Sequence, residues 1–190
     1  MAMGIQTDNK TTVNVHIYSP GVGTGVSAHF QLPADNRDIF TGRKAELKAL
    51  QQKMNSKTPV VITGLPGMGK TQVITRYIYD HLERYSSCFY FDASNVNILH
   101  RQYKNLYRVL NLGVSTCSLS SPVIIDKIRT HLGSMHSEKP WICVYDGAMS
   151  QNELSSFLPM GGHVLITSRS TKWEPAWQYS LGLMSHEDSS

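Results

Sequence analysis

Short apolar runs alternate with amphipathic stretches along most of the chain. Runs that are apolar throughout are typical of buried strands, and they occupy residues 58–63, 88–91, 141–145 and 163–167, with a further candidate strand at 177–183. The stretches around them carry apolar residues at helical spacing and predict helices over residues 43–54, 70–85, 95–112, 121–132 and 150–157. Fully apolar strands separated by helices predict an α/β fold, with about five strands in a mostly parallel sheet and helices on both faces.

The first 37 residues follow a different pattern. Residues 12–18 alternate apolar and polar side chains, which is typical of a strand, and a turn-rich, glycine-rich stretch follows at 19–25. We therefore divide the chain into a flexible N-terminal segment, 1–37, with one possible strand, and a folded domain, 38–190. Two interpretations of the segment stay open: a linker with one edge strand, or a β-prone tract that pairs with copies of itself.

Composition and charge narrow the class of protein. The chain has 190 residues, 18 Lys and Arg, 14 Asp and Glu, and a net charge of +4 with neutral histidines, which suits one ordinary domain. No run of Lys or Arg exceeds two residues, so a nucleic-acid partner is not expected. Cys88, Cys117 and Cys143 form no CxxC pair and predict neither a disulfide framework nor a zinc site. With no long apolar stretch, the sequence predicts a cytoplasmic protein without a membrane span.

One glycine-rich segment carries the clearest chemistry. Residues 64–71, with the sequence GLPGMGKT, fit the phosphate-binding pattern G-x-x-x-x-G-K-[ST] between a predicted strand and a predicted helix. Its glycines let successive backbone amides turn toward phosphate oxygens, Lys70 supplies a positive charge to the terminal phosphates, and Thr71 offers a hydroxyl to Mg²⁺. The predicted nucleotide-binding residues here are Gly64, Leu65, Pro66, Gly67, Met68, Gly69, Lys70, Thr71 and Gln72.

Two later strand ends add candidate residues. Asp146 follows the strand 141–145 and is expected to hold Mg²⁺ together with Thr71. Arg169 follows the strand 163–167, and the carboxyl ends of strands in an open parallel sheet line the ligand crevice. We therefore expect Arg169 beside the phosphates, where it could sense the last one. The simpler interpretations are a strand-end turn for Asp146 and a solvated side chain for Arg169.

Four motifs in this order resemble the NB-ARC group of the STAND signalling ATPases: residues 39–46, 64–71, 141–146 and 165–169. The resemblance covers about residues 38–185 and implies a P-loop sheet that binds ADP tightly and switches on exchange for ATP, with exchange controlling self-assembly. It implies that Phe40, Gly42 and Arg43 lie against the adenine and that Arg169 reads the γ-phosphate. The implied ligands are ADP or ATP with Mg²⁺, and the implied partners are further copies or further domains of a longer protein.

Two departures from that group change the expected activity. Gly147 follows Asp146 where many P-loop ATPases carry a second acid, so hydrolysis is expected to be slow or absent. The chain also ends near the point where the group's helical and winged-helix subdomains follow, which indicates a truncated domain. Two alternatives stay open: a free-standing P-loop ATPase or small-molecule kinase, and an interaction fragment that binds no nucleotide.

Overall fold

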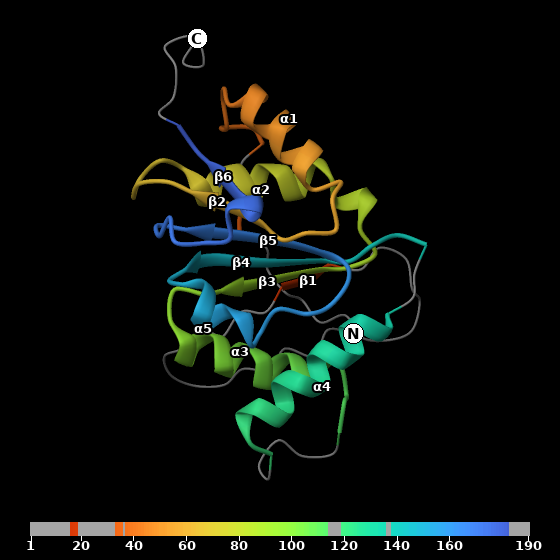
Figure 1. The fold of residues 1–190 in the computed structure, drawn as a ribbon. Coiled ribbons are helices and arrows are strands. Elements are labelled where there is room, and N and C mark those ends of the chain that lie inside the picture. The colour runs from red at the N-terminus through yellow and green to blue at the C-terminus, as the bar shows by residue number, and fades with distance from the viewer. Residues whose placement is uncertain (1–15, 19–32, 36, 114–118, 136–137, 183–190) are drawn as a thin grey trace.

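The computed structural model describes residues 16–18, 33–35, 37–113, 119–135 and 138–182, which form one sheet between two layers of helices (Figure 1). The strands are β1 (His16–Tyr18), β2 (Val60–Thr63), β3 (Cys88–Asp92), β4 (Ile142–Ala148), β5 (His163–Ser168) and β6 (Gln178–Ser180). The helices are α1 (Lys44–Lys53), α2 (Lys70–Asp80), α3 (Val96–Val109), α4 (Ser121–Ser134) and α5 (Gln151–Ser155), with short 3₁₀ turns at Leu82–Arg84 and Pro175–Trp177.

The sheet has the strand order β1-β3-β4-β5-β2-β6. Five of the strands are parallel to one another: β3, β4, β5, β2 and β6. The remaining strand, β1, pairs antiparallel with β3 at one edge of the sheet. The predicted α/β fold with five parallel strands is therefore confirmed. β1 belongs to the alternating tract 12–18, and the rest of that tract lies outside the described residues. Because all five strands point the same way, their carboxyl ends share one edge of the sheet, to which the loop before α2 also belongs (Figure 1).

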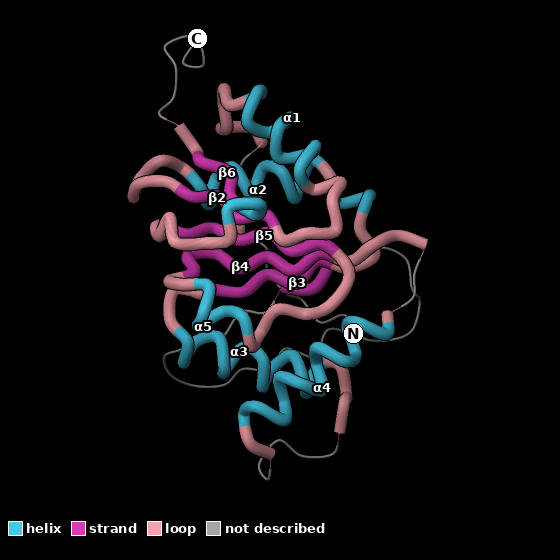
Figure 2. The backbone as a smooth tube through the Cα atoms, viewed as in Figure 1, coloured by secondary structure: helices cyan, strands magenta, loops and turns pink. Residues whose placement is uncertain are grey.

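Each face of the sheet packs against its own helices. In Figure 2, α1 and α2 lie on one side of the strands and α3, α4 and α5 on the other. The α1–α2 side buries a core that includes Leu50, Ile74, Tyr77, Tyr90 and Val144. The opposite side buries a core that includes Phe91, Tyr103, Ile128, Tyr145 and Phe157. Strands buried on both faces explain the unbroken apolar runs in the sequence.

The alternation of side chains along β3 and β4 decides which residues reach the carboxyl edge on the α2 side. Tyr90 of β3 and Val144 of β4 both pack in the α1–α2 core. Two residues further on, the same face carries Asp92 and Asp146, which are paired in register across the two strands. One carboxylate therefore ends β3 and the other lies two residues before the end of β4, on the face that α2 covers.

Several predicted helix ends differ from the structure; the helices predicted over 95–112 and 150–157, for example, span Val96–Val109 and Gln151–Ser155. The helix predicted over 70–85 ends at Asp80, because His81 leaves the helical region with φ −125° and a 3₁₀ turn follows. The pair Ser121 and Pro122 is typical of an N-cap and a first helical residue, but the N-cap is Ser120, one residue earlier, so Pro122 is the second helical residue. Proline is tolerated there because the first turn has no intrahelical use for its missing N–H.

Two smaller expectations concern the cysteines and the membrane. Cys88 and Cys143 are buried thiols, and burial raises the pKa of Cys88 to about 12, while Cys117 lies outside the described residues. Among the residues that the structure describes, no helix has the length and apolar character needed to span a membrane.

Candidate functional site

The glycine-rich segment forms the turn between the end of β2 and the start of α2. Gly67 and Gly69 have φ of +78° and +80°, the left-handed region that glycine enters without strain. Gly69 is the N-cap of α2, so the unpaired N–H groups of the helix's first turn lie beside the loop. A side-chain carbon at Gly67 would meet nothing within 4 Å, so the loop has an open surface there. This is the geometry of an anion cradle at a helix N-terminus.

Lys70 reaches back across this loop. Its Nζ donates hydrogen bonds to the carbonyl oxygens of Gly64, at 2.8 Å, and Leu65, at 2.7 Å. Burial lowers the pKa of the Lys70 ammonium, the charge of Arg169 lowers it further, and the charge of Asp146 opposes both effects. The ammonium therefore lies close enough to both charged residues to respond to them.

Asp146 is the centre of a hydrogen-bond network at the end of β4. Its carboxylate accepts from the hydroxyl of Thr71, at 2.9 Å to the nearer oxygen, from the hydroxyl of Tyr90, at 2.8 Å, and from that of Thr167. The Thr167 hydroxyl in turn accepts from the backbone N–H of Gly147 at 2.7 Å. The structure thus brings Thr71 and Asp146 together, as the motif spacing predicts.

Tyr90 and Thr167 are the members of this network that the sequence did not single out. Tyr90 lies within an apolar run, where it reads as a core residue, and only the alternation along β3 places it two residues before Asp92 on the α2 face. Thr167 ends the predicted strand 163–167, two residues before the candidate Arg169. Both side chains are buried, and their hydroxyls hold the Asp146 carboxylate in place.

A polar pocket of about 460 Å³ lies over these residues. Its lining combines the glycine-rich loop with the carboxyl ends of β3, β4 and β5. The residues are Pro66, Gly67, Gly69, Lys70, Thr71, Asp92, Ser94, Asp146, Gly147, Thr167, Ser168 and Arg169. The exposed Arg169 therefore shares one pocket with Lys70, Thr71 and Asp146.

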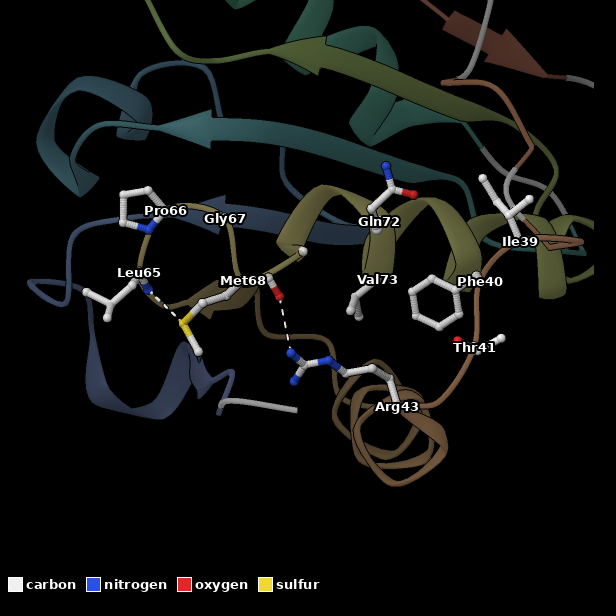
Figure 3. A pocket seen from close by; sticks show the side chains of 11 residues that line it. Ile39, Phe40, Thr41, Arg43, Leu65, Pro66, Gly67, Met68, Gln72 and Val73 are labelled. Carbon is white, nitrogen blue, oxygen red and sulfur yellow. Dashed lines mark hydrogen bonds between the residues drawn. The ribbon is translucent and has the colours of Figure 1, made fainter. Parts of the chain in front are cut away.

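A second pocket, of about 590 Å³, lies on the other side of the same loop (Figure 3). Its lining is largely apolar and joins the segment before α1 to the loop and the first turn of α2. The residues are Ile39, Phe40, Thr41, Arg43, Leu65, Pro66, Gly67, Met68, Gly69, Gln72 and Val73. Phe40, Arg43, Met68 and Gln72 thus join one pocket, while Gly42 is outside its lining. Since Pro66, Gly67 and Gly69 line both pockets, a ligand could extend from the apolar one into the polar one.

Arg43 holds the apolar pocket together. Its guanidinium is buried and donates to the carbonyl of Met68 at 3.2 Å, the carbonyl of Gly182 at 2.8 Å and the carboxylate of Glu46 at 2.9 Å. The contact with the Met68 carbonyl is visible in Figure 3. Arg43 therefore ties the start of α1 to the glycine-rich loop and to the segment after β6.

Replacing Arg43 with methionine is expected to lower the free energy of unfolding by about 3 kcal/mol, because the change leaves a partly buried carboxylate and two carbonyls without their donor. Urea denaturation followed by circular dichroism measures this loss. Arg101→Met on the exposed side of α3 is the matched control and should change the midpoint little. A midpoint for Arg43→Met equal to that of the control would contradict the role of Arg43 as a tie.

Comparison by sequence gives a local similarity. No protein-family model matches the chain. A stretch of 88 residues is 31% identical to the DNA replication ATP-dependent helicase/nuclease DNA2 of Xenopus tropicalis, covering 43% of this chain. The chain spans only 8% of the length of that protein. The NB-ARC resemblance therefore rests on the sequence motifs alone.

Comparison by structure covers most of the chain. Cdc6p from Pyrobaculum aerophilum has a TM-score of 0.50 at 14% identity, over 84% of this chain and 48% of that one. A chain of the Drosophila ORC bound to DNA has a TM-score of 0.52 at 12% identity, over 75% of this chain and 91% of that one. The expectation against a nucleic-acid partner gains no support from these neighbours, because that ORC structure is a complex with DNA. Together with the strand order and the loop between β2 and α2, the similarities show that the chain has the α/β fold of the P-loop NTPases.

Proposed function

We propose that this chain is the ADP- and ATP-binding switch module of a STAND-type signalling protein of the NB-ARC group, in which nucleotide exchange controls self-assembly. The observation that carries the proposal is the pair of pockets joined by the glycine-rich loop. One is largely apolar and suits a purine base, and the other is polar and suits phosphates.

The polar pocket supports binding of the phosphates. Backbone N–H groups around Gly67 and Gly69 supply donors, and the start of α2 adds its positive end. Lys70, held at the loop carbonyls of Gly64 and Leu65, has a charged group that can exchange these acceptors for phosphate oxygens. Arg169 lies on the rim of the same pocket, where the terminal phosphate would complement its charge.

The same pocket has the oxygen donors that Mg²⁺ prefers. The Thr71 hydroxyl and the Asp146 carboxylate are in direct hydrogen-bond contact, so both could serve one small cation. When bound, Mg²⁺ would neutralise charge on the phosphate oxygens. Tyr90 and Thr167 would keep the carboxylate in place, as the outer partners of metal ligands commonly do.

The apolar pocket supports binding of the base. Phe40 offers an aromatic ring, and the guanidinium of Arg76 lies 5.8 Å from the centre of that ring on the α2 side. The exposed Ile39 and Leu65 extend the apolar rim. Arg43 supports this site from behind through the Met68 carbonyl, because its guanidinium is already engaged with protein acceptors.

The nucleotide released on denaturation tests the proposal directly. We expect ADP, identified by ion-exchange chromatography of the supernatant from purified, heat-denatured chain. Added ADP and ATP should raise the melting temperature to a similar extent. The candidate for reading the last phosphate in the described pocket is a single exposed side chain, Arg169, and one such contact gives little discrimination. Saturation at a hundredfold excess over Kd corresponds to about 2.7 kcal/mol of added stability.

Two outcomes separate the rival functions. No released nucleotide together with no thermal shift by ADP or ATP would favour an interaction fragment that binds no nucleotide. Turnover near the roughly 10 s⁻¹ of a typical enzyme would favour a free-standing ATPase or kinase. For the switch we expect turnover far below that value, because Gly147 provides no carboxylate after Asp146.

Binding of nucleic acid needs a separate test. One similar protein is a DNA replication helicase/nuclease, and one similar structure is a complex with DNA. The switch proposal predicts that duplex DNA leaves nucleotide affinity and turnover unchanged. Stimulation of turnover by DNA would place the chain among DNA-dependent ATPases instead.

A further inference from the structure

The residue after Asp146 cannot readily be an acid in this fold. Gly147 has φ of +80°, a conformation that side chains rarely adopt, and it lies where the pairing of β4 with β5 is irregular. A side-chain carbon at this position would lie 3.4 Å from the Cβ of Ser94. The turn that follows β3 therefore occupies the space beside Gly147.

That turn carries its own carboxylate. Asp92 ends β3 in register with Asp146 and on the same face, and it lines the polar pocket. Its Oδ1 accepts from the backbone N–H of Ser94 at 2.9 Å and from the Ser94 hydroxyl at 2.5 Å. The backbone N–H of Ala93 donates to the Asp146 carbonyl at 2.8 Å, which fixes the turn to β4. The carboxylate is thus oriented by its own turn, and among the described residues no donor is bonded to its other oxygen.

The position of Asp92 relative to Asp146 suits a different task from metal binding. Adjacent strands lie about 4.8 Å apart, and Asp92 is one strand further than Asp146 from the loop-bearing β2. The Thr71 hydroxyl reaches Asp146 directly, whereas Asp92 is bonded to Ser94. Asp92 can therefore face a water molecule in the pocket without competing for the same donors.

Resting on the proposed function, we propose that Asp92 is the general base for the slow hydrolysis of bound ATP, in place of the acid that Gly147 excludes. The carboxylate orients a water molecule and accepts its proton as the water oxygen bonds to the γ-phosphorus. The bond from that phosphorus to the β–γ bridging oxygen breaks, and the electron pair leaves with ADP. The products are ADP and inorganic phosphate, and the proton passes from Asp92 to solvent.

Asp92→Asn in the full chain tests this role, because the amide keeps the shape and the Ser94 contacts but cannot take a proton. We expect Kd values for ADP and ATP within twofold of the unsubstituted chain by calorimetry. We expect single-turnover hydrolysis of radiolabelled ATP to fall at least tenfold. The affinity for ADP with aluminium fluoride, which mimics the transferring phosphoryl group and its water, should also fall at least tenfold, and this readout does not depend on turnover.

Two further variants sharpen the result. Ser94→Ala removes one of the two donors that orient Asp92, so a smaller loss of hydrolysis is expected with unchanged ADP affinity. Asp126→Asn on the exposed side of α4 is the matched control and should behave as the unsubstituted chain.

The outcomes that overturn the inference are distinct from those that overturn the proposed function. Unchanged hydrolysis and aluminium fluoride affinity in Asp92→Asn, or no measurable hydrolysis in the unsubstituted chain, would reject Asp92 as the base while nucleotide binding stands. A parallel loss of ADP affinity would make Asp92 a binding residue and would also reject it. Failure of the unsubstituted chain to bind nucleotide would reject the proposed function and the inference with it.

Discussion

Replacing Lys70 with alanine is expected to weaken nucleotide binding at least a hundredfold while the fold survives. The ammonium lies over the glycine-rich loop, bonded to the carbonyls of Gly64 and Leu65, and takes no part in either buried core. Each hydrogen bond from a charged group to a phosphate oxygen contributes about 1.5–3 kcal/mol. Loss of two such bonds is therefore worth about 3–6 kcal/mol, or roughly 10² to 10⁴ in affinity.

Calorimetric titration with ADP measures this loss, and the melting temperature without nucleotide shows whether the variant is folded. Lys127→Ala, on the exposed side of α4, removes the same charge on the opposite face of the sheet and should keep full affinity. A folded Lys70→Ala variant with the affinity of this control would show that the glycine-rich loop is not the binding site.

The order of strands and helices is predictable from the sequence because each parallel strand is buried on both sides. Strands such as β4 and β5 then appear as unbroken apolar runs, and the helices between them show apolar residues on one side only. The exceptions lie at helix ends. Whether α2 continues past Asp80 depends on the backbone of His81, which the periodicity of Tyr77, Ile78 and Leu82 does not encode.

The candidate site is predictable only in part, because a motif fixes residue types and tertiary contacts fix their partners. The loop pattern identifies Lys70 and Thr71, and the strand pattern identifies Asp146. The hydrogen bond from Arg43 to the carbonyl of Gly182 joins residues 139 positions apart, so no local sequence pattern predicts it. The same holds for Tyr90, which reaches Asp146 from a neighbouring strand across 56 positions.

Charges at the carboxyl edge of the sheet are arranged in two groups. Lys70 and Arg169 supply positive charge beside the loop, and Asp92 and Asp146 supply negative charge at the ends of β3 and β4. Phosphates would be drawn to the first group and a divalent cation to the second, so a Mg²⁺–nucleotide complex would complement both. Under the proposed function, this division of charge would let one pocket favour the complex over either free ion.

Replacing Asp146 with asparagine is expected to remove the contribution of Mg²⁺ to nucleotide affinity. The carboxylate supplies the negative charge beside the Thr71 hydroxyl, and an amide keeps the shape but supplies no charge. Substitution of the outer partners of a metal ligand typically costs about 10–100-fold in metal affinity. A residue that holds the ion itself should reach the upper end of that range, so we expect about a hundredfold loss of Mg²⁺ affinity in the nucleotide complex.

The measurement is the ratio of ATP affinity in Mg²⁺ to that in EDTA, determined by fluorescence titration with a labelled nucleotide. In the unsubstituted chain and in the control Asp126→Asn, Mg²⁺ should tighten binding. In Asp146→Asn the two affinities should converge. Since the amide cannot accept hydrogen bonds from Thr71, Tyr90 and Thr167 through both of its terminal atoms, some loss of stability is expected as well. The ratio is insensitive to that loss, because both titrations use the same folded variant. A ratio in Asp146→Asn equal to that of the control would assign Mg²⁺ to residues other than Asp146.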